Sequence, residues 1–244
     1  MVVRNMLAEW TKLRSTASFW WTSALILVFT IGWTILFASL DSADAPSYDP
    51  MLVTSSYSTF SLAVVMIQAI MIVTTEYRFK VSGTNYQVTP QRWEVAVAKL
   101  LLYVIISVVL SFVTLVIAYV AGDLIAANPI DWTENEFVKR SLWVLPLCTA
   151  AVVVFCQGIS WLIRQTAGAV SLVLVWWLIL EGMLAMIPKV GDKIFKYAPF
   201  NNFNQFLNDT PNPDWGIWTS FGIFAAFAFG FWIIGVIVLE LRDA

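Results

Sequence analysis

Glu181 is the acidic side chain best placed for chemistry inside an apolar stretch, about two helical turns from the end of its run. An ionisable residue inside a membrane span is costly, so it marks a candidate substrate path or cation site. Gln68 lies inside another apolar run and is the second candidate for such a path. An alternative stays open for Glu181, in which it lies close enough to the outer membrane surface for its carboxylate to be wetted or to be capped by Ser or Thr neighbours.

Other groupings that support catalysis are missing from the sequence. There is no histidine, which removes the usual neutral-pH base and the commonest metal ligand. No G-x-x-x-x-G-K-[ST] phosphate loop is present, so the chain does not bind and split ATP in that manner. Cys148 and Cys156 are separated by about 12 Å of helical rise, too far for a disulfide. We expect no enzymatic activity, no metal and no bound cofactor.

The elements that carry these side chains follow from the composition. Hydrophobic residues make up 59% of the 244 residues, and the mean hydropathy is +0.77. Soluble domains carry about 25% charged residues, whereas this chain carries 12%. A soluble core of this size could not hide so much apolar surface, so the composition predicts a polytopic membrane protein.

Six apolar runs are long enough to cross a bilayer core of about 30 Å as helices. They cover residues 19–40, 55–75, 100–120, 141–163, 166–187 and 215–239. The expected fold class is an all-α polytopic membrane protein with six transmembrane helices. We expect one transmembrane domain over residues 1–244, with no second, soluble domain.

The lysines and arginines predict that both termini are cytoplasmic, because cationic residues near span ends resist translocation. Nine of them fall on the predicted inner side: Arg4, Lys12, Arg14, Arg78, Lys80, Arg92, Lys99, Arg164 and Arg242. Five fall outside: Lys139, Arg140, Lys189, Lys193 and Lys196. The expected location is a bacterial cytoplasmic (inner) membrane, crossed several times.

Two further segments have the character of interfacial helices. In residues 1–18, apolar side chains recur at helical spacing and polar ones fill the opposite side, which predicts an amphipathic helix on the inner membrane surface. Residues 188–214 mix phenylalanines with polar side chains on the outer side. That mixture predicts one or two short helices that are re-entrant or interfacial.

The sequence of the predicted cytoplasmic loop 76–99 indicates more secondary structure than a simple connection between two spans requires. Glu76 precedes Lys80 by four residues, which stabilises a helix, and Gly83 then interrupts the pattern. Thr89 and Pro90 read as an N-cap and a first helical residue. We expect a short helix, a turn and a new helix that enters the membrane. A cytoplasmic partner is expected to dock on this loop.

With these features in place, the whole chain resembles the permease subunits of bacterial type-2 ATP-binding-cassette exporters in their short form. The resemblance is carried by Glu9-Trp10-Thr11-Lys12-Leu13-Arg14 before the first span, by the six-span layout, and by the loop between spans two and three. In that loop Glu76-Tyr77-Arg78, Gly83-Thr84, Pro90 and Ala98-Lys99 are similar to the family pattern.

The resemblance implies a division of labour between subunits. Two permease chains pair, as a homodimer or heterodimer, and each sits on a separate ATPase subunit that binds ATP and magnesium. The residues implied in ATPase coupling are Glu76, Tyr77, Arg78, Lys80 and Gly83. The connecting helix that also rests on the ATPase is implied to use Glu9, Trp10, Lys12 and Arg14. The other implied partner is the lipid bilayer, and no nucleic acid is expected.

The expected function is therefore the membrane-spanning half of an ATP-driven exporter. Relatives export drugs, peptides, antibiotics, lipids and polysaccharides, and the apolar spans without a carbohydrate-binding domain favour an amphiphilic or drug-like cargo. Two alternatives stay open: a stand-alone ion-coupled secondary transporter or channel that uses Glu181, and a non-transporting membrane scaffold or sensor subunit.

Overall fold

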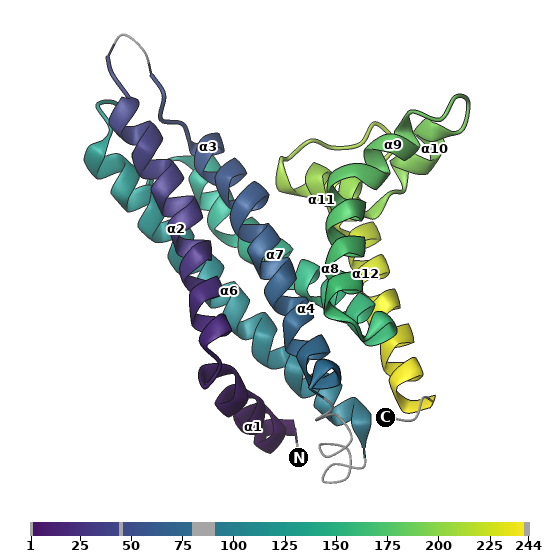
Figure 1. The fold of residues 1–244 in the computed structure, drawn as a ribbon. Coiled ribbons are helices and arrows are strands. Elements are labelled where there is room, and N and C mark those ends of the chain that lie inside the picture. The colour runs from purple at the N-terminus through teal and green to yellow at the C-terminus, as the bar shows by residue number, and fades with distance from the viewer. Residues whose placement is uncertain (1, 44–45, 80–90, 242–244) are drawn as a thin grey trace. The chain divides into compact units, whose positions relative to one another are not determined.

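The chain is all-α in a computed structural model that describes residues 2–43, 46–79 and 91–241 (Figure 1). Of the described residues 83% are helical, and none lies in a strand. The elements in chain order are α1 (Val2–Arg14), α2 (Ala17–Leu40), α3 (Pro50–Ser56), η1 (Tyr57–Ser61), α4 (Leu62–Arg78), α6 (Arg92–Ile125), α7 (Glu136–Ile163), α8 (Thr166–Val175), η2 (Trp176–Leu180), α9 (Glu181–Ala185), α10 (Gly191–Lys196), α11 (Pro199–Leu207) and α12 (Ile217–Leu241).

Six stretches of helix in the described chain are long and apolar enough to cross a membrane: Ala17–Leu40, Pro50–Arg78, Arg92–Ile125, Glu136–Ile163, Thr166–Ala185 and Ile217–Leu241. Large apolar side chains such as Val28, Leu178 and Ile233 are more than half exposed on them, as a lipid-facing surface requires. The predicted fold class with six spans is confirmed. The cytoplasmic placement of both termini stays a prediction.

Both ends of the predicted loop 76–99 lie in helices, and its role as a cytoplasmic coupling loop stays a prediction. Glu76, Tyr77 and Arg78 belong to the last turn of α4 and form no separate helix. The next helix, α6, starts at Arg92 and continues without interruption to Ile125, so the prediction of a new helix that runs into the membrane is confirmed. Lys80, Gly83, Thr84, Thr89 and Pro90 lie outside the described residues.

The segment 188–214 contains two short helices, as predicted. α10 and α11 are joined at Ala198, where Pro199 opens α11 as its first residue. Proline suits that position because its missing N–H is not needed there. The re-entrant or interfacial placement of this segment stays a prediction.

The described residues divide into two compact units, whose boundaries lie within continuous helices. Unit 1 comprises Met1–Glu9, Ala69–Tyr103 and Ala151–Ala244, and unit 2 comprises Trp10–Gln68 and Val104–Ala150. The prediction of a single transmembrane domain stays a prediction.

In unit 2, hydroxyl groups join the spans. The Tyr119 hydroxyl lies 2.9 Å from that of Ser141, and the Thr30 and Ser61 hydroxyls are 2.7 Å apart. Ser61 ends η1, a short π-helical turn within the second span. Such hydrogen bonds hold apolar helices together where the hydrophobic effect between them is weak.

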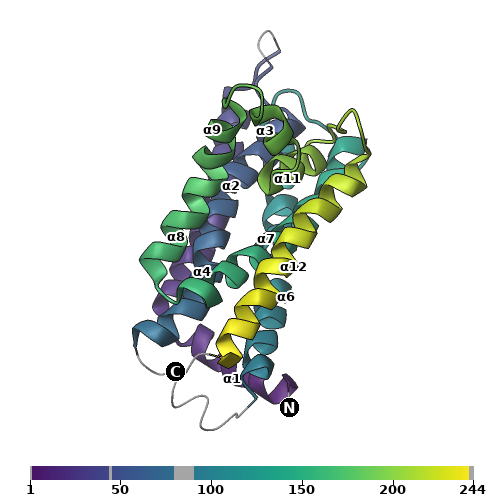
Figure 2. The same cartoon turned by 90° about the vertical axis from the view of Figure 1, so that its right-hand side faces the viewer.

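In unit 1, α7 and α12 approach so closely that only glycine fits. A Cβ on Gly158 would lie 2.6 Å from the backbone nitrogen of Trp232, and one on Gly235 would lie 2.8 Å from the Gly158 oxygen. Beside this contact, Trp161 is buried with Val73, Ala96 and Leu239. Figure 2 shows α12 in yellow, running the length of this unit. The core thus fixes α4, α6, α7 and α12 around the sites described next.

Candidate functional site

A buried ion cluster joins α1, α4 and α6 in unit 1. We define it as the Lys99 cluster: Glu9 of α1, Glu76 of α4 and Lys99 of α6. The Lys99 Nζ donates to Glu76 Oε1 at 2.8 Å and also to Glu9 Oε2. The three side chains are at most 10% exposed. Because charges removed from water are stable only when paired, these contacts fix the three helices to one another.

Further bonds strengthen the same end of unit 1. Asn5 Nδ2 of α1 donates to Glu94 Oε2 of α6 at 3.4 Å. The Arg92 Nη1 donates to the Leu239 oxygen at 3.1 Å, and the Trp93 N–H donates to Glu240 Oε1 at 2.8 Å. The Glu240 carboxylate therefore satisfies one of the open amides at the start of α6. The helices that flank residues 80–90 are thus fastened to α1 and to α12.

The structure brings together two of the coupling and connecting residues named from the sequence, Glu9 and Glu76. Their common partner, Lys99, was counted among the predicted inner cations but not assigned to the site. A signal was present, since Lys99 is a cation at the start of an apolar run, where an unpaired charge would be costly.

The other predicted coupling residues are placed separately. Tyr77 packs edge-on against Trp161 with ring centroids 6.3 Å apart. Arg78 ends α4 and is exposed, with its guanidinium 5.6 Å from the Phe79 ring centroid. Lys80 and Gly83 lie outside the described residues, and their coupling role stays a prediction.

The remaining connecting-helix residues fall in unit 2. Trp10 is half-buried and packs edge-on against Phe19, with centroids 6.2 Å apart. Lys12 and Arg14 are exposed at the end of α1, where the Arg14 carbonyl accepts a bond from Trp20 Nε1 at 2.8 Å. This turn fixes the direction in which the chain leaves α1 for the first span.

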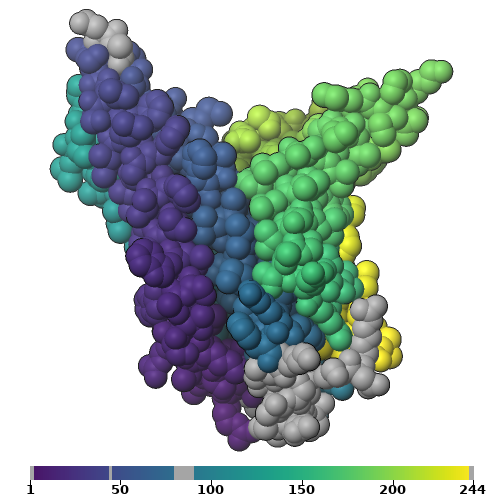
Figure 3. Space-filling model, in the orientation of Figure 1, coloured from purple at the N-terminus to yellow at the C-terminus, as the bar shows by residue number. Residues whose placement is uncertain are grey.

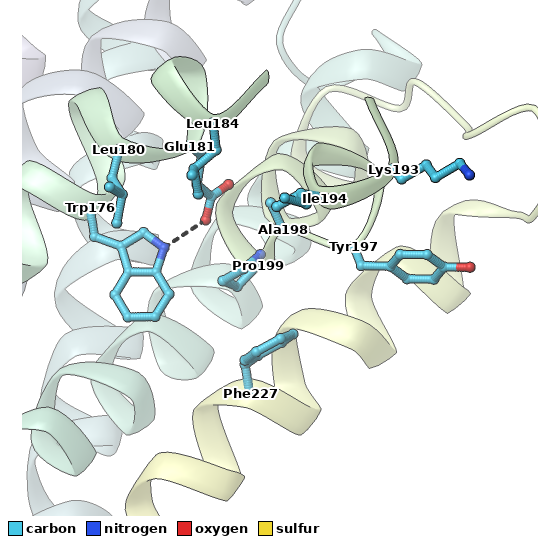
Figure 4. A pocket seen from close by; sticks show the side chains of 10 residues that line it. All are labelled: Trp176, Leu180, Glu181, Leu184, Lys193, Ile194, Tyr197, Ala198, Pro199 and Phe227. Atoms are coloured by element: carbon cyan, nitrogen blue, oxygen red, sulfur yellow. Dashed lines mark hydrogen bonds between the residues drawn. The ribbon is translucent and has the colours of Figure 1, made fainter. Parts of the chain in front are cut away.

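A second candidate site is an apolar cavity of about 470 Å³ at the η2–α9 end of unit 1. We call it the Glu181 pocket; its lining residues are Trp176, Leu180, Glu181, Leu184, Lys193, Ile194, Tyr197, Ala198, Pro199 and Phe227. Figure 4 shows Glu181 and Trp176 on one wall, Phe227 of α12 on another, and the Lys193 amine directed away from the apolar wall. The pocket thus combines apolar walls with a cation at its edge.

The Glu181 carboxylate in this pocket caps a helix. Its Oε1 accepts from the Phe200 N–H at 2.9 Å and from Trp176 Nε1 at 3.0 Å, and its Oε2 accepts from the Asn201 N–H at 2.7 Å. The residue at the N-cap of α11 is Ala198, which has no side-chain acceptor. Glu181 supplies that acceptor and places negative charge at the positive end of the helix.

The π-helical turn η2 explains how this carboxylate reaches Trp176. Its i to i+5 bonding pattern aligns residues five apart, and Trp176 and Glu181 are separated by five positions. The geometry matches the capped alternative for Glu181, although its donors are backbone amides and an indole. No signal in the sequence marks α11 amides as partners, because backbone N–H groups are common to almost all residues.

Gln68, the second residue named for a substrate path, lies in unit 2. It is buried, and its Nε2 donates to the Phe19 oxygen and to Ser23 Oγ, both at 3.2 Å. These bonds tie the second span to the first. A role for Gln68 in a substrate path stays a prediction.

Metal chemistry has no candidate in the part of the chain that the structure describes: no group of three His, Cys, Asp or Glu side chains is arranged to hold an ion. Cys148 and Cys156 are free and buried. The described residues therefore offer ion pairing, helix capping and apolar binding.

Comparison with known proteins agrees with this arrangement of membrane spans. No curated protein matches the chain. A family model described as ABC-2 family transporter protein matches residues 6–180, which include the Lys99 cluster, four complete spans and most of the fifth. Multiple apolar helices and this match identify a multi-pass membrane protein, and the chain belongs to the ABC-2 family of transporter proteins.

Proposed function

We propose that the chain is the permease subunit of an ATP-driven exporter, and that residues 76–99 couple it to a separate ATPase subunit. Family membership supports a membrane component of a transporter that is not itself catalytic. In this proposal ATP and magnesium are bound by the ATPase subunit, where phosphoryl-transfer enzymes hold them.

The observation that carries the coupling proposal is the Lys99 cluster. Glu76 lies in the last turn before residues 80–90, and Lys99 lies in the first turns after them. Glu76 and Lys99 are hydrogen-bonded to each other, and Lys99 also donates to Glu9 of α1. A movement of residues 80–90 caused by the ATPase would therefore move the ends of α4, α6 and α1 together, because separating these helices would leave buried charges unpaired in an apolar medium.

The test is a bulky substitution at the predicted docking turn. In vesicles that contain the chain and the ATPase encoded beside it, Gly83→Trp should abolish copurification of the ATPase and its stimulated ATP hydrolysis. The matched control is Gly216→Trp, because a Cβ at Gly216 meets open space. Normal assembly and turnover with Gly83→Trp would overturn the coupling assignment.

For the cargo, we propose an amphiphilic molecule. The Glu181 pocket supports this class because its walls are aromatic and aliphatic and its edge carries Lys193. Apolar pockets with few polar groups are typical of sites for drug-sized ligands. Phe227→Ala should change transport of a fluorescent amphiphile, whereas Phe229→Ala, an exposed position on the same helix, should not. Equal effects of the two variants on transport would show that the Glu181 pocket does not bind the transported molecule.

Pairing of two permease chains is part of the same proposal. The family resemblance supports it, and cross-linking of two differently tagged copies in native membranes tests it. A band that contains both tags is expected, and its absence at all cross-linker lengths would contradict a homodimer and favour a heterodimer.

A further inference from the structure

A polar cavity of about 470 Å³ lies in unit 1 at the C-terminal end of α4. We call it the arginine pocket; it is lined by Tyr77, Arg78, Arg164, Gln165, Thr166 and Ala167. Two of these residues are arginines, and they come from different helices: Arg78 ends α4, and Arg164 lies in the turn between α7 and α8.

Neither arginine forms an ion pair with a described residue. The Arg164 guanidinium lies 5.1 Å from the Tyr77 ring centroid, and its Nη2 donates to the Val238 oxygen at 3.3 Å. Its Nε is buried and has no hydrogen-bond partner among the described residues. The adjoining sequence 80–90 contains no Asp or Glu. Among the described residues, the pocket therefore holds two positive charges that no ion pair neutralises.

The position of Arg164 is set by a strained turn. Only Arg164 and Gln165 join α7 to α8, and Arg164 has φ of 56°, in the left-handed region that non-glycine residues rarely adopt. Such conformations are strained and cluster at active sites and ligand clamps. The Thr166 hydroxyl lies 2.8 Å from that of Thr74, which holds the start of α8 against α4.

The start of α8 adds a second attraction for anions. Gln165 at its N-cap makes no side-chain capping bond, and the first amides of a helix favour negative charge. The guanidinium groups of Arg78 and Arg164 match phosphate because each can donate two parallel hydrogen bonds. A phosphate group fits both features of the pocket.

We propose that the arginine pocket binds the phosphate of an anionic phospholipid. Arg78 is the last residue of one candidate span and Arg164 separates two others, so the pocket lies at the depth of lipid headgroups. From the pocket, α8 and η2 continue with exposed Leu172 and Val175 of α8 and Ile179 of η2. Figure 3 shows this helix in green as an outward-facing surface along which acyl chains can lie. This continuity favours a lipid over free phosphate, and the inference does not depend on ATPase coupling.

The experiment measures lipid retention by the purified full chain. Native mass spectrometry should show that the wild type retains phosphatidylglycerol in preference to phosphatidylcholine. Arg78→Gln with Arg164→Gln should lower that preference about thirtyfold, since each of the two cations near a membrane surface contributes about 1 kcal/mol. Arg4→Gln is the matched control, because Arg4 is an exposed arginine on α1 outside the pocket. If Arg164→Gln does not fold, the exposed Arg78→Gln alone carries the test.

Three results would overturn the proposal. The first is equal phosphatidylglycerol retention by the wild type and the pocket variants. The second is displacement of the lipid by millimolar inorganic phosphate, which would identify a site for free phosphate. The third is unchanged lipid retention with loss of ATPase copurification, which would assign the pocket to the partner subunit.

Discussion

The Lys99 cluster and the Glu181 pocket place buried carboxylates at two ends of unit 1, but they stabilise them differently. Glu9 and Glu76 share the ammonium group of Lys99. Glu181 accepts hydrogen bonds from two backbone amides and one indole. An ion pair can join side chains of separate helices in many relative orientations, whereas amide binding requires backbone N–H groups, at a helix N-terminus or in a loop, that point toward the acid.

The amide-binding mode recurs elsewhere in the described chain. Glu240 accepts from the Trp93 N–H at the start of α6. Asp41, just after α2, accepts from the N–H groups of Ser47 and Asn128, both at 2.7 Å. The difference teaches that Glu9 and Glu76 share the cation of Lys99 in the part of the chain that the structure describes, while the amide-bound acids depend on the backbone geometry of the segments that donate to them.

Removal of that cation should have the largest effect. Lys99→Met leaves Glu9 and Glu76 buried without their ammonium partner, and breaking such a pair costs about 3–5 kcal/mol. Thermal unfolding in detergent should show a large loss of stability. Lys139→Met is the control, because its pair with Glu136 is exposed. If both variants melt alike, the cluster does not hold α1, α4 and α6 together.

Removal of the Glu181 acceptor should have an intermediate effect. Glu181→Ala strands the amides of Phe200 and Asn201, at a cost of about 1–3 kcal/mol. Glu181→Gln keeps one carbonyl acceptor and should be milder, with the same thermal unfolding assay as readout. Glu134→Ala, at an exposed position, controls for loss of an acid. Equal destabilisation by Ala and Gln would mean that charge, and not hydrogen bonding, is what the site needs.

Neutralisation of one acid in the Lys99 cluster should have a smaller effect, and its sign should depend on Lys99. In the wild type, Glu76→Gln leaves Lys99 paired with Glu9, so we expect a loss of about 1 kcal/mol. In the Lys99→Met background the same change removes a buried negative charge that has lost the Lys99 ammonium, and it should raise the melting temperature. A destabilising effect in both backgrounds would contradict a cluster that acts through charge.

The smallest effect should be a dependence on pH outside the spans. The N–H of Ser47, with those of Asn128 and Tyr48, holds the pKa of Asp41 below its ordinary value. The folded chain thus binds fewer protons than the unfolded chain, so this stabilisation is complete above pH 4 and is lost as pH falls through the lowered pKa. Melting curves between pH 6 and pH 3 should show the loss, and Asp41→Asn should remove that part of it. An unchanged slope in Asp41→Asn would assign the loss to other acids.

The spans could be predicted from the sequence because runs of about 20 apolar residues have few structures open to them besides membrane helices. The partners within the sites could not. Glu9 and Lys99 are 90 positions apart, and neither local periodicity nor charge counting pairs residues at that distance. The backbone amides that bind Glu181 could not be predicted, because every residue except proline has such a group. The π-helical turn that aligns Trp176 with Glu181 has no characteristic amino-acid composition by which to recognise it.

The glycine contact between α7 and α12 has a consequence for motion. Backbone atoms at Gly158, Trp232 and Gly235 have no rotamers to change, so the two helices can pivot there but cannot repack as side chains do. α12 carries Phe227 on one side of this contact and Val238 and Leu239 on the other. One continuous helix therefore connects the bonds of Arg92 and Arg164 at one end of α12 to the Phe227 wall of the Glu181 pocket, with the glycine contact between them.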